Sequence, residues 1–441
     1  MRPRRAAAAP VRIVHLGLGG FFRAHQAWYT GAAPDAARWG IAAFTGRSRT
    51  LPDRLSAQDG LYTLVVRGPD HDEATVQSAV SVARAGTDLD AWCAYLAGPQ
   101  VAVVTLTVTE AAYRRHRDGG PDLDDPELRA DLDALRHGGR VTTVPGRLVA
   151  GLAARHAGGA GPLAVVCCDN LPDNGAATAR VVRGLAAAAR PELARWIDGS
   201  VSFVTTMVDR ITPRTTPADV RTVAELTGYV DAVPVVTEPF SEWVLSGDFP
   251  AGRPAWEAAG ARFVDDVTPH ETRKLLLLNG AHSLLAYAGG ARGHDTVAAA
   301  VADPVCRGWL ERWWDEAARY VPLPAAEVAA YRAALLRRFA NPRIRHLLAQ
   351  IAADGSQKLP IRLLPVLRGE RAAGRLPAGA VRTLAGWIQH LRGIGTPVDD
   401  AGAGAYRDRA GAPREVLALL APDLATDEEL GHALDRAVSD R

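Results

Sequence analysis

The chain has 441 residues, which is enough for two or three domains. Its 51 basic and 49 acidic residues give a formal net charge of +2, so nucleic acid and anionic membranes are not expected as its main partners. Hydrophobic residues make up 48% and charged residues 23%, which is typical of a globular protein. No apolar run reaches the roughly 18 residues of a membrane span.

The N-terminal segment MRPRRAAAAP has a few alanines where a signal peptide carries an apolar stretch of roughly 7–15 residues. We interpret it as a disordered tail and expect a cytoplasmic protein. The four cysteines form no CxxC pattern. They are expected to be packed thiols in a reducing compartment, and no metal site is expected.

Short apolar runs alternate with helical patterns in the first half of the chain. Strands are expected within 11–19, 39–46, 101–109 and 162–170, and a helix opens within 22–30. This alternation predicts βαβ units and a mostly parallel sheet. Ligands of such sheets bind beyond the carboxyl ends of the strands. Six residues fall at these ends: Gly17, Gly19, Thr107, Thr109, Asp169 and Asn170.

The pattern changes near residue 265. Thr268, Pro269 and Glu271 form a typical helix start, and apolar residues recur at helical spacing in 307–321 and 325–340. We therefore expect an α/β Rossmann-type domain with a mostly parallel sheet over residues 1–265. An all-α domain should follow over residues 266–441.

The segment HLGLGGFFRAH (15–25) contains Gly17-x-Gly19, with Phe22 where a dinucleotide fingerprint has its third glycine. The first glycine permits a tight turn, and the second lets the backbone approach a pyrophosphate. Helix N–H groups would face that anion, and Arg23 and His25 could add positive charge. The alternative is a glycine turn that serves packing alone.

An acidic residue that binds the ribose hydroxyls is expected at the end of the second strand, but that end reads FTGRSRT. Arg47, Ser48 and Arg49 could instead accept a 2′-phosphate, which favours NADP over NAD. The alternative is a solvated basic loop. The coenzyme therefore stays open between NAD and NADP.

The segment KLLLLNGAH (274–282) contains Lys274, one of two lysines in the chain, and Asn279, one of four asparagines. Arginine cannot lose its proton in a protein, whereas a buried lysine can. An apolar setting lowers the pKa of lysine from about 10.4 toward the roughly 7–8 of a catalytic base. The alternative is that the lysine survives by chance in an arginine-biased chain.

Removal of a proton and a hydride from a CH–OH group leaves negative charge on the oxygen, and the amides of Asn170 and Asn279 could donate to it. On an ideal α-helix His282 shares a face with Asn279, and Lys274 lies about 140° from Asn279. All of these side chains can border one cleft. The alternatives are a turn residue for Asn170 and a core histidine for His282.

Several further motifs occur in a fixed order along the chain. They are GLGGFFRAHQAWYT, QDGLYTLV, TLTVTE, CDNLPDNG, MVDRITP, TEPFSEWVL, KLLLLNGAH and DGSQKLP. Over nearly the whole chain this set resembles the long-chain polyol dehydrogenase (mannitol dehydrogenase) family. The resemblance implies a Rossmann-type domain, a helical domain, a cleft between them and metal-independent hydride transfer to a nicotinamide.

The resemblance also implies residue roles. Lys274 matches the general base, Asn170 and Asn279 the pair that holds the substrate oxygen, and His282 a residue that orients the substrate. The matching substrate-side residues are Asp209, Glu271, Lys358 and Gln350. The expected coenzyme contacts are Gly17, Gly19, Phe21, Arg23, Arg47, Thr107, Thr109 and Glu110.

Two positions depart from the family pattern. Many members have His at Phe22, and some mannitol-oxidising members have Arg at Gln350, which would grip the far end of the sugar. Two structural alternatives to substrate binding also stay open: Asp209 could form an ion pair with Arg210, and Lys358 could lie in a surface loop.

The leading hypothesis is an NAD(P)-dependent dehydrogenase that interconverts a polyol such as mannitol with its ketose. A sugar acid (fructuronate or mannonate) or a phosphorylated hexitol are alternative substrates. A non-catalytic nucleotide-binding regulator and a helical scaffold are alternatives of other classes. The expected partner is a small sugar alcohol or sugar acid, and the chain is expected to be a monomer or small homo-oligomer.

Overall fold

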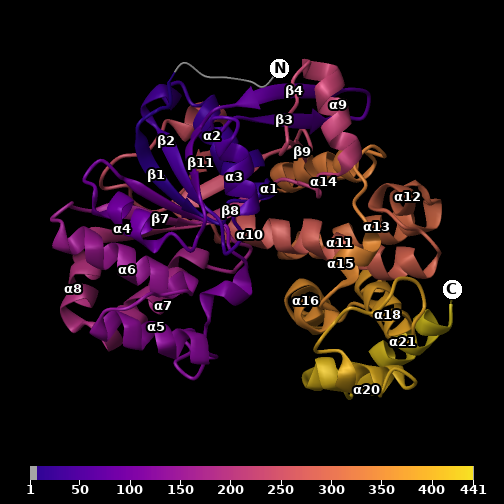
Figure 1. Cartoon of the computed structure of the whole chain (residues 1–441). Coiled ribbons are helices and arrows are strands. Elements are labelled where there is room, and N and C mark those ends of the chain that lie inside the picture. The colour runs from indigo at the N-terminus through magenta and orange to yellow at the C-terminus, as the bar shows by residue number, and fades with distance from the viewer. Residues whose placement is uncertain (1–6, 441) are drawn as a thin grey trace. The chain divides into compact units, whose positions relative to one another are not determined.

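The computed structural model describes residues 7–440 and divides the chain into two compact units, Met1–Val267 and Thr268–Arg441 (Figure 1). Residues 1–6 of the expected tail lie outside the described part. The tail is shorter than expected, because Ala9 accepts a hydrogen bond from Ser81 (2.7 Å) and Pro10 accepts one from the backbone of Gly40 (2.8 Å).

Unit 1 is built on an eight-stranded sheet with the order β11-β10-β8-β7-β6-β1-β2-β5. Its neighbours pair in parallel except β8 and β10, which are antiparallel. The mostly parallel Rossmann-type sheet is thus confirmed. The strands are β1 (Val11–Leu16), β2 (Gly40–Phe44), β5 (Val80–Arg84), β6 (Val103–Leu106), β7 (Leu163–Cys167), β8 (Val201–Asp209), β10 (Glu242–Ser246) and β11 (Arg262–Phe263).

Side chains alternate between the two faces of this sheet, so each face has its own core. In β1, Ile13 packs on one face, whereas Val14 and Leu16 pack on the other. The second core includes residues from α4 (Leu89–Ala97), α5 (Pro126–His137), α6 (Val144–Ala157), α7 (Asn174–Ala189) and α8 (Pro191–Ser200). The first core includes residues from α1 (Gly20–Ala24), α2 (Gln26–Ala32), α3 (Thr50–Ser56) and η3 (Trp256–Ala259).

A second, three-stranded sheet extends unit 1 and has the order β4-β3-β9. Val65, Val236 and Val223 form a small cluster that joins this sheet to a helix. The elements are β3 (Tyr62–Arg67), β4 (Asp72–Gln77), β9 (Val235–Thr237) and α9 (Pro217–Thr227).

The strands end earlier than the apolar runs in the sequence, because the backbone turns. After β1, Gly17 has φ 112°, and after β6, Thr109 has φ 91°. Such values interrupt an extended strand. The helix expected within 22–30 is two short helices, which meet at His25.

Unit 2 is helical, as expected, and its described residues contain one isolated bridge, between Thr296 and Leu347. Within residues 7–440, no helix combines the length and the apolar character needed to cross a bilayer. After residue 290 the helices are α12 (Val297–Ala302), α13 (Pro304–Ala317), η6 (Ala318–Tyr320), α14 (Ala325–Phe339), α15 (Leu348–Ala352), α16 (Gly355–Arg362), α17 (Leu364–Ala372), α18 (Ala378–Leu391), α19 (Gly404–Arg407), α20 (Pro413–Leu420), η7 (Pro422–Leu424) and α21 (Glu428–Ser439).

The first helical stretch of unit 2 changes its winding twice. It runs through α10 (Thr268–Arg273), the π-helix η4 (Lys274–Asn279), α11 (Gly280–Leu284) and the π-helix η5 (Leu285–Gly289). A π-helix bonds residue i to residue i+5 instead of i+4, so residues five apart come near to one face. The expected angle of about 140° between Lys274 and Asn279 is therefore wrong, because it assumes an α-helix.

Two tryptophans of α13 support this π-helix. The indole N–H groups of Trp313 and Trp314 donate to the carbonyls of Leu276 and Leu277 at 3.0 and 2.9 Å. Both rings are buried, and a Cβ on Gly280 would lie 2.3 Å from the Trp313 ring. The indoles thus give two carbonyls of the π-helix a side-chain donor from a neighbouring helix.

This support predicts a specific loss of stability in Trp313→Phe. The variant keeps an aromatic ring but removes the indole hydrogen bond to the buried carbonyl of Leu276, which costs about 0.5–1.5 kcal/mol beyond the effect of lost volume. Chemical denaturation would measure the free energy of unfolding. Trp243→Phe is the matched control, because Trp243 is fully buried and its N–H has no partner within residues 7–440. Equal losses in the two variants would contradict the role of the indole N–H.

Candidate functional site

The glycine turn follows β1, between the ends of β2 and β6. The N–H groups of Gly17 and Leu18 donate to the carbonyl of Phe44 at 2.8 and 2.9 Å, and the hydroxyl of Thr107 donates to the carbonyl of Gly17 at 3.0 Å. A Cβ on Gly17 would lie 2.0 Å from the carbonyl oxygen of Thr107. With its positive φ, position 17 therefore requires glycine for the fold itself.

Gly19 differs from Gly17. Its φ is −143°, and the nearest atom to an added Cβ is the carbonyl oxygen of Gly17 at 3.5 Å. That distance is ordinary van der Waals contact. The protein around Gly19 thus gives no steric reason for glycine, whereas a ligand that approaches the backbone would give one.

The residues after the turn face the protein interior. Phe22 is fully buried and stacks on His15 with ring centroids 3.5 Å apart. Arg23 is buried as well, and its guanidinium donates to the carbonyls of Gly19 (3.0 Å) and Val233. Arg23 therefore braces the glycine turn from within, which corrects the expectation that it adds an open positive charge there.

His15 and Phe21 complete the packing around the turn. Burial lowers the pKa of His15 to about 3, and its ring nitrogens contact the hydroxyls of Thr105 (2.8 Å) and Thr107 (3.2 Å). Phe21 is half-buried and stacks on His25, with ring centroids 5.1 Å apart. The turn is therefore rigidly packed on its inner side.

The loop after β6 is held by Asp169, which follows β7. Its carboxylate accepts from the backbone N–H groups of Val108 (2.7 Å) and Thr109 (2.9 Å) and from the hydroxyl of Tyr113 (2.6 Å). Burial raises the pKa of this carboxyl, although the three donors favour its ionised form. Thr109 is a β-branched residue at positive φ, and such strain often marks a functional loop. Glu110 follows it, exposed, at the start of η2 (Glu110–Tyr113).

A pocket of about 320 Å³ lies beyond these strand ends. Of the expected coenzyme residues, Gly17, Arg47 and Thr107 line it. The strand order reverses between β1 and β6, and this switch point is where open α/β sheets bind ligands. Arg114, Glu127 and Arg147 line the same pocket, and the sequence reading did not identify them.

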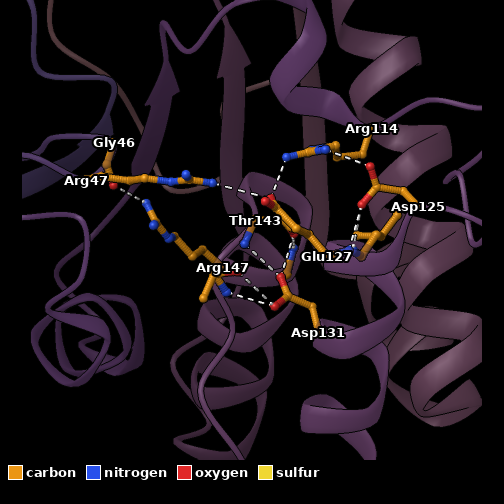
Figure 2. A network of polar contacts seen from close by, with 11 residues as sticks. Gly46, Arg47, Arg114, Asp125, Glu127, Asp131, Thr143 and Arg147 are labelled. Atoms are coloured by element: carbon orange, nitrogen blue, oxygen red, sulfur yellow. Dashed lines mark hydrogen bonds and ion pairs between the residues drawn. The ribbon is translucent and has the colours of Figure 1, made fainter.

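An ion-pair network borders this pocket (Figure 2). Oε2 of Glu127 contacts the guanidinium of Arg47 at 3.3 Å and that of Arg114 at 2.5 Å. Asp125 contacts Arg114 at 2.6 Å. Arg147 donates to the carbonyl of Gly46 at 3.0 Å and so fixes the turn after β2.

Two further expected residues lie at strand ends of unit 1. Asn170 is exposed in the turn after β7, and Asp209 is the last residue of β8 and is buried. Arg210 contacts the carbonyls of Ala24 (2.6 Å) and Glu238 (3.3 Å), and its guanidinium lies over Trp28. The backbone contacts of Arg210 thus give it a structural role.

In unit 2, Lys274, Asn279 and His282 lie on one continuous helical stretch. Lys274 is half-buried, whereas Asn279 and His282 are 8% and 7% exposed. His282 packs against Phe339 and His346, with ring centroids 4.9 and 4.8 Å away. Within the described residues its Nε2 has no hydrogen-bond partner.

The surroundings of His282 are positively charged. Burial holds the pKa of its imidazole well below the usual range, and His346, Arg362, Arg338 and Lys274 lower it further. His282 is therefore neutral near pH 7. A neutral imidazole can donate with one nitrogen and accept with the other, which suits contact with a hydroxyl group.

The remaining expected residues also lie in unit 2. Glu271 is half-buried in α10, and Gln350 is exposed on α15. Lys358 lies in α16, so the surface-loop alternative is wrong. Its ammonium donates to the carbonyls of Ile351 (3.3 Å) and Ala353 (2.5 Å) at the end of α15. Such contacts satisfy carbonyls that a helix end leaves open.

One group of potential metal ligands, His294, Asp303 and Cys306, occurs within the described residues. Asp303 caps α13 by accepting from the N–H of Val305 (2.8 Å), and it contacts Arg292 at 2.6 Å and His294 at 2.9 Å. These contacts account for the cluster as a helix cap with ion pairs, so it gives no reason to invoke a metal.

Comparison with known proteins bears on the whole chain. Residues 11–258 match the model of the mannitol dehydrogenase Rossmann domain, and residues 266–420 match the mannitol dehydrogenase C-terminal domain. D-mannonate oxidoreductase of Escherichia coli K12 is 38% identical over 398 residues, which are 87% of this chain and 80% of the relative. Mannitol 2-dehydrogenase of Cereibacter sphaeroides is 36% identical over 419 residues, which are 92% and 87% of the two chains.

A solved structure agrees with these matches. The ternary complex of Pseudomonas fluorescens mannitol 2-dehydrogenase with NAD and D-mannitol is 34% identical, with a TM-score of 0.85. The similarity covers 98% of this chain and 92% of that one. The chain therefore belongs to the mannitol dehydrogenase family and is an oxidoreductase that acts on CH–OH groups.

Proposed function

We propose that this chain transfers hydride between NAD or NADP and a secondary alcohol of a polyol, with Lys274 as the general base. The observation that carries the proposal is the π-helix, which turns Lys274 and Asn279 toward one face of a single helical stretch. A base and an amide donor on one face can serve the same oxygen atom.

The steps balance without a metal ion. The hydride leaves the carbon for the nicotinamide ring, and the hydroxyl proton passes to the neutral amine of Lys274. The side-chain amides of Asn170 and Asn279 donate to the oxygen as its negative charge develops, and one such donor contributes about 10²–10³ in rate. The Nε2 of His282, which has no hydrogen-bond partner within residues 7–440, supports a contact with another substrate hydroxyl.

The coenzyme half of the proposal rests on unit 1. Packing within the protein explains glycine at position 17 but not at position 19. A pyrophosphate at the glycine turn explains Gly19, since a side chain there would hold the anion away from the backbone. The pocket of about 320 Å³ would then take the adenosine part of the coenzyme.

A sugar acid is the second candidate substrate. Arg338 and Arg362 are close enough to His282 to depress its pKa. Positive charge of this kind favours a substrate with a carboxylate. D-mannonate oxidoreductase of Escherichia coli, one of the relatives, carries a sugar acid in its name. Activity with fructose and with fructuronate would distinguish the two substrate classes.

The role of Lys274 predicts that Lys274→Ala and Lys274→Arg both lose turnover by at least ~10²-fold, since general base catalysis contributes about 10²–10⁴. Arginine keeps the positive charge but cannot accept the proton at working pH. Absorbance of the reduced nicotinamide follows turnover, and coenzyme titration should show unchanged binding. Restoration of activity in Lys274→Ala by added methylamine would support the role directly. A Lys274→Arg enzyme within tenfold of the parent would rule it out.

The two glycines predict a contrast that separates folding from binding. Gly17→Ala should lower the free energy of unfolding by more than ~1 kcal/mol, because it combines a positive φ with a clash. Gly19→Ala should unfold like the parent and still bind NAD and NADP at least about tenfold more weakly. Thermal unfolding and coenzyme titration measure the two effects. Tight coenzyme binding by Gly19→Ala would contradict a pyrophosphate at this turn.

A further inference from the structure

The end of β2 lacks the acidic residue that usually selects NAD, yet the structure brings a carboxylate to the same place. Glu127 lies 80 residues after Arg47 in the sequence, and both line the pocket that includes Gly17 and Thr107. Glu127 is in the first turn of α5, where the positive end of the helix favours an anion.

The position of Glu127 is fixed from two sides. Asp125 caps α5 by accepting from the N–H groups of Glu127 (2.9 Å) and Leu128 (3.0 Å), and the same carboxylate contacts Arg114 at 2.6 Å. Arg114 then contacts Glu127 (Figure 2). The carboxylate is thus presented at the rim of the pocket by its own helix and by a guanidinium.

The ion pairs of Arg47 determine whether its guanidinium is available to bind a 2′-phosphate. Arg47 is 75% exposed and shares Oε2 of Glu127 with Arg114. Both guanidiniums are therefore already paired with one carboxylate. Within the described residues, the second oxygen of Glu127, Oε1, accepts no hydrogen bond. That oxygen can accept from a ribose hydroxyl.

We propose that Glu127 selects NAD over NADP, taking from helix α5 the role that an acidic residue after the second strand usually has. This inference rests on the proposed function, since it assumes a nicotinamide coenzyme in this pocket. Oε1 accepts from the ribose hydroxyls of NAD. The 2′-phosphate of NADP brings about two negative charges to the same place and meets the carboxylate before it can reach Arg47 or Arg114.

This proposal is the opposite of the preference for NADP that the segment FTGRSRT suggested. Arg47 alone favours a 2′-phosphate, but Arg47 held by Glu127 does not, because the phosphate would have to displace an existing ionic partner. The discrimination arises from repulsion of the wrong coenzyme as much as from attraction of the right one.

Glu127→Gln tests this inference, since it removes the charge and keeps the shape. The parent should prefer NAD over NADP in kcat/KM by more than ~10-fold, and the variant should lower that ratio at least ~10-fold, mainly through tighter NADP binding. Calorimetric titration with 2′,5′-ADP and with ADP gives a readout that needs no turnover. The variant should bind 2′,5′-ADP at least ~10-fold more tightly than the parent does.

Two controls sharpen the test. Glu127→Gln combined with Arg47→Ala should lose the gain in 2′,5′-ADP affinity, because Arg47 is one of the cations that Glu127 releases. Asp133→Asn removes an exposed carboxylate from the same helix and should leave the coenzyme ratio unchanged. An NADP-preferring parent, or an unchanged ratio in Glu127→Gln, would overturn the role of Glu127 alone. Failure of the parent to bind either coenzyme would overturn the proposed function with it.

Discussion

The indole donors of α13 and the π-helix that they contact are the constraint on which the arrangement of side chains at the start of unit 2 depends. Trp313 and Trp314 donate to two backbone carbonyls of the π-helix. Gly280 lets the Trp313 ring lie against the helix. The extra residue in this turn decides which side chains share a face, so the placement of Lys274 relative to Asn279 is set by residues more than thirty positions away.

The architecture of unit 1 could be predicted because each signal was local. Apolar, β-branched runs such as Val103–Leu106 and Leu163–Cys167 are buried on both faces, and the helices between them require parallel strands. The strand ends were less predictable. A run such as 101–109 remains β-branched beyond Leu106, but the backbone turns there, because the carboxylate of Asp169, which follows another strand, accepts from the N–H groups of Val108 and Thr109.

Residues of the candidate site could be predicted only where the residue type itself indicates the role, as glycine does in a tight turn. Gly17 could be identified from the turn it makes, but its partner Thr107 adds a steric requirement that the sequence does not reveal. Hydrophobic periodicity does not distinguish an α-helix from a π-helix of six residues, so the angle between Lys274 and Asn279 was wrong. The role proposed for Glu127 could not be predicted from the sequence. The segment PELR is typical of an ordinary helix start, and the contact between Glu127 and Arg47 joins residues that are distant in the sequence.

The use of basic residues in this chain separates structural from chemical roles. All but two of its 51 basic residues are arginine, and buried arginines such as Arg23 and Arg210 donate to several backbone carbonyls at once. The planar, permanently charged guanidinium has several N–H donors and is suited to binding several carbonyls at once. Lys358 also has a structural reason, since its compact ammonium reaches two carbonyls at the end of α15. At Lys274 the reason we propose is different in kind: a base must be able to lose its proton, and arginine cannot replace it there however well it fits.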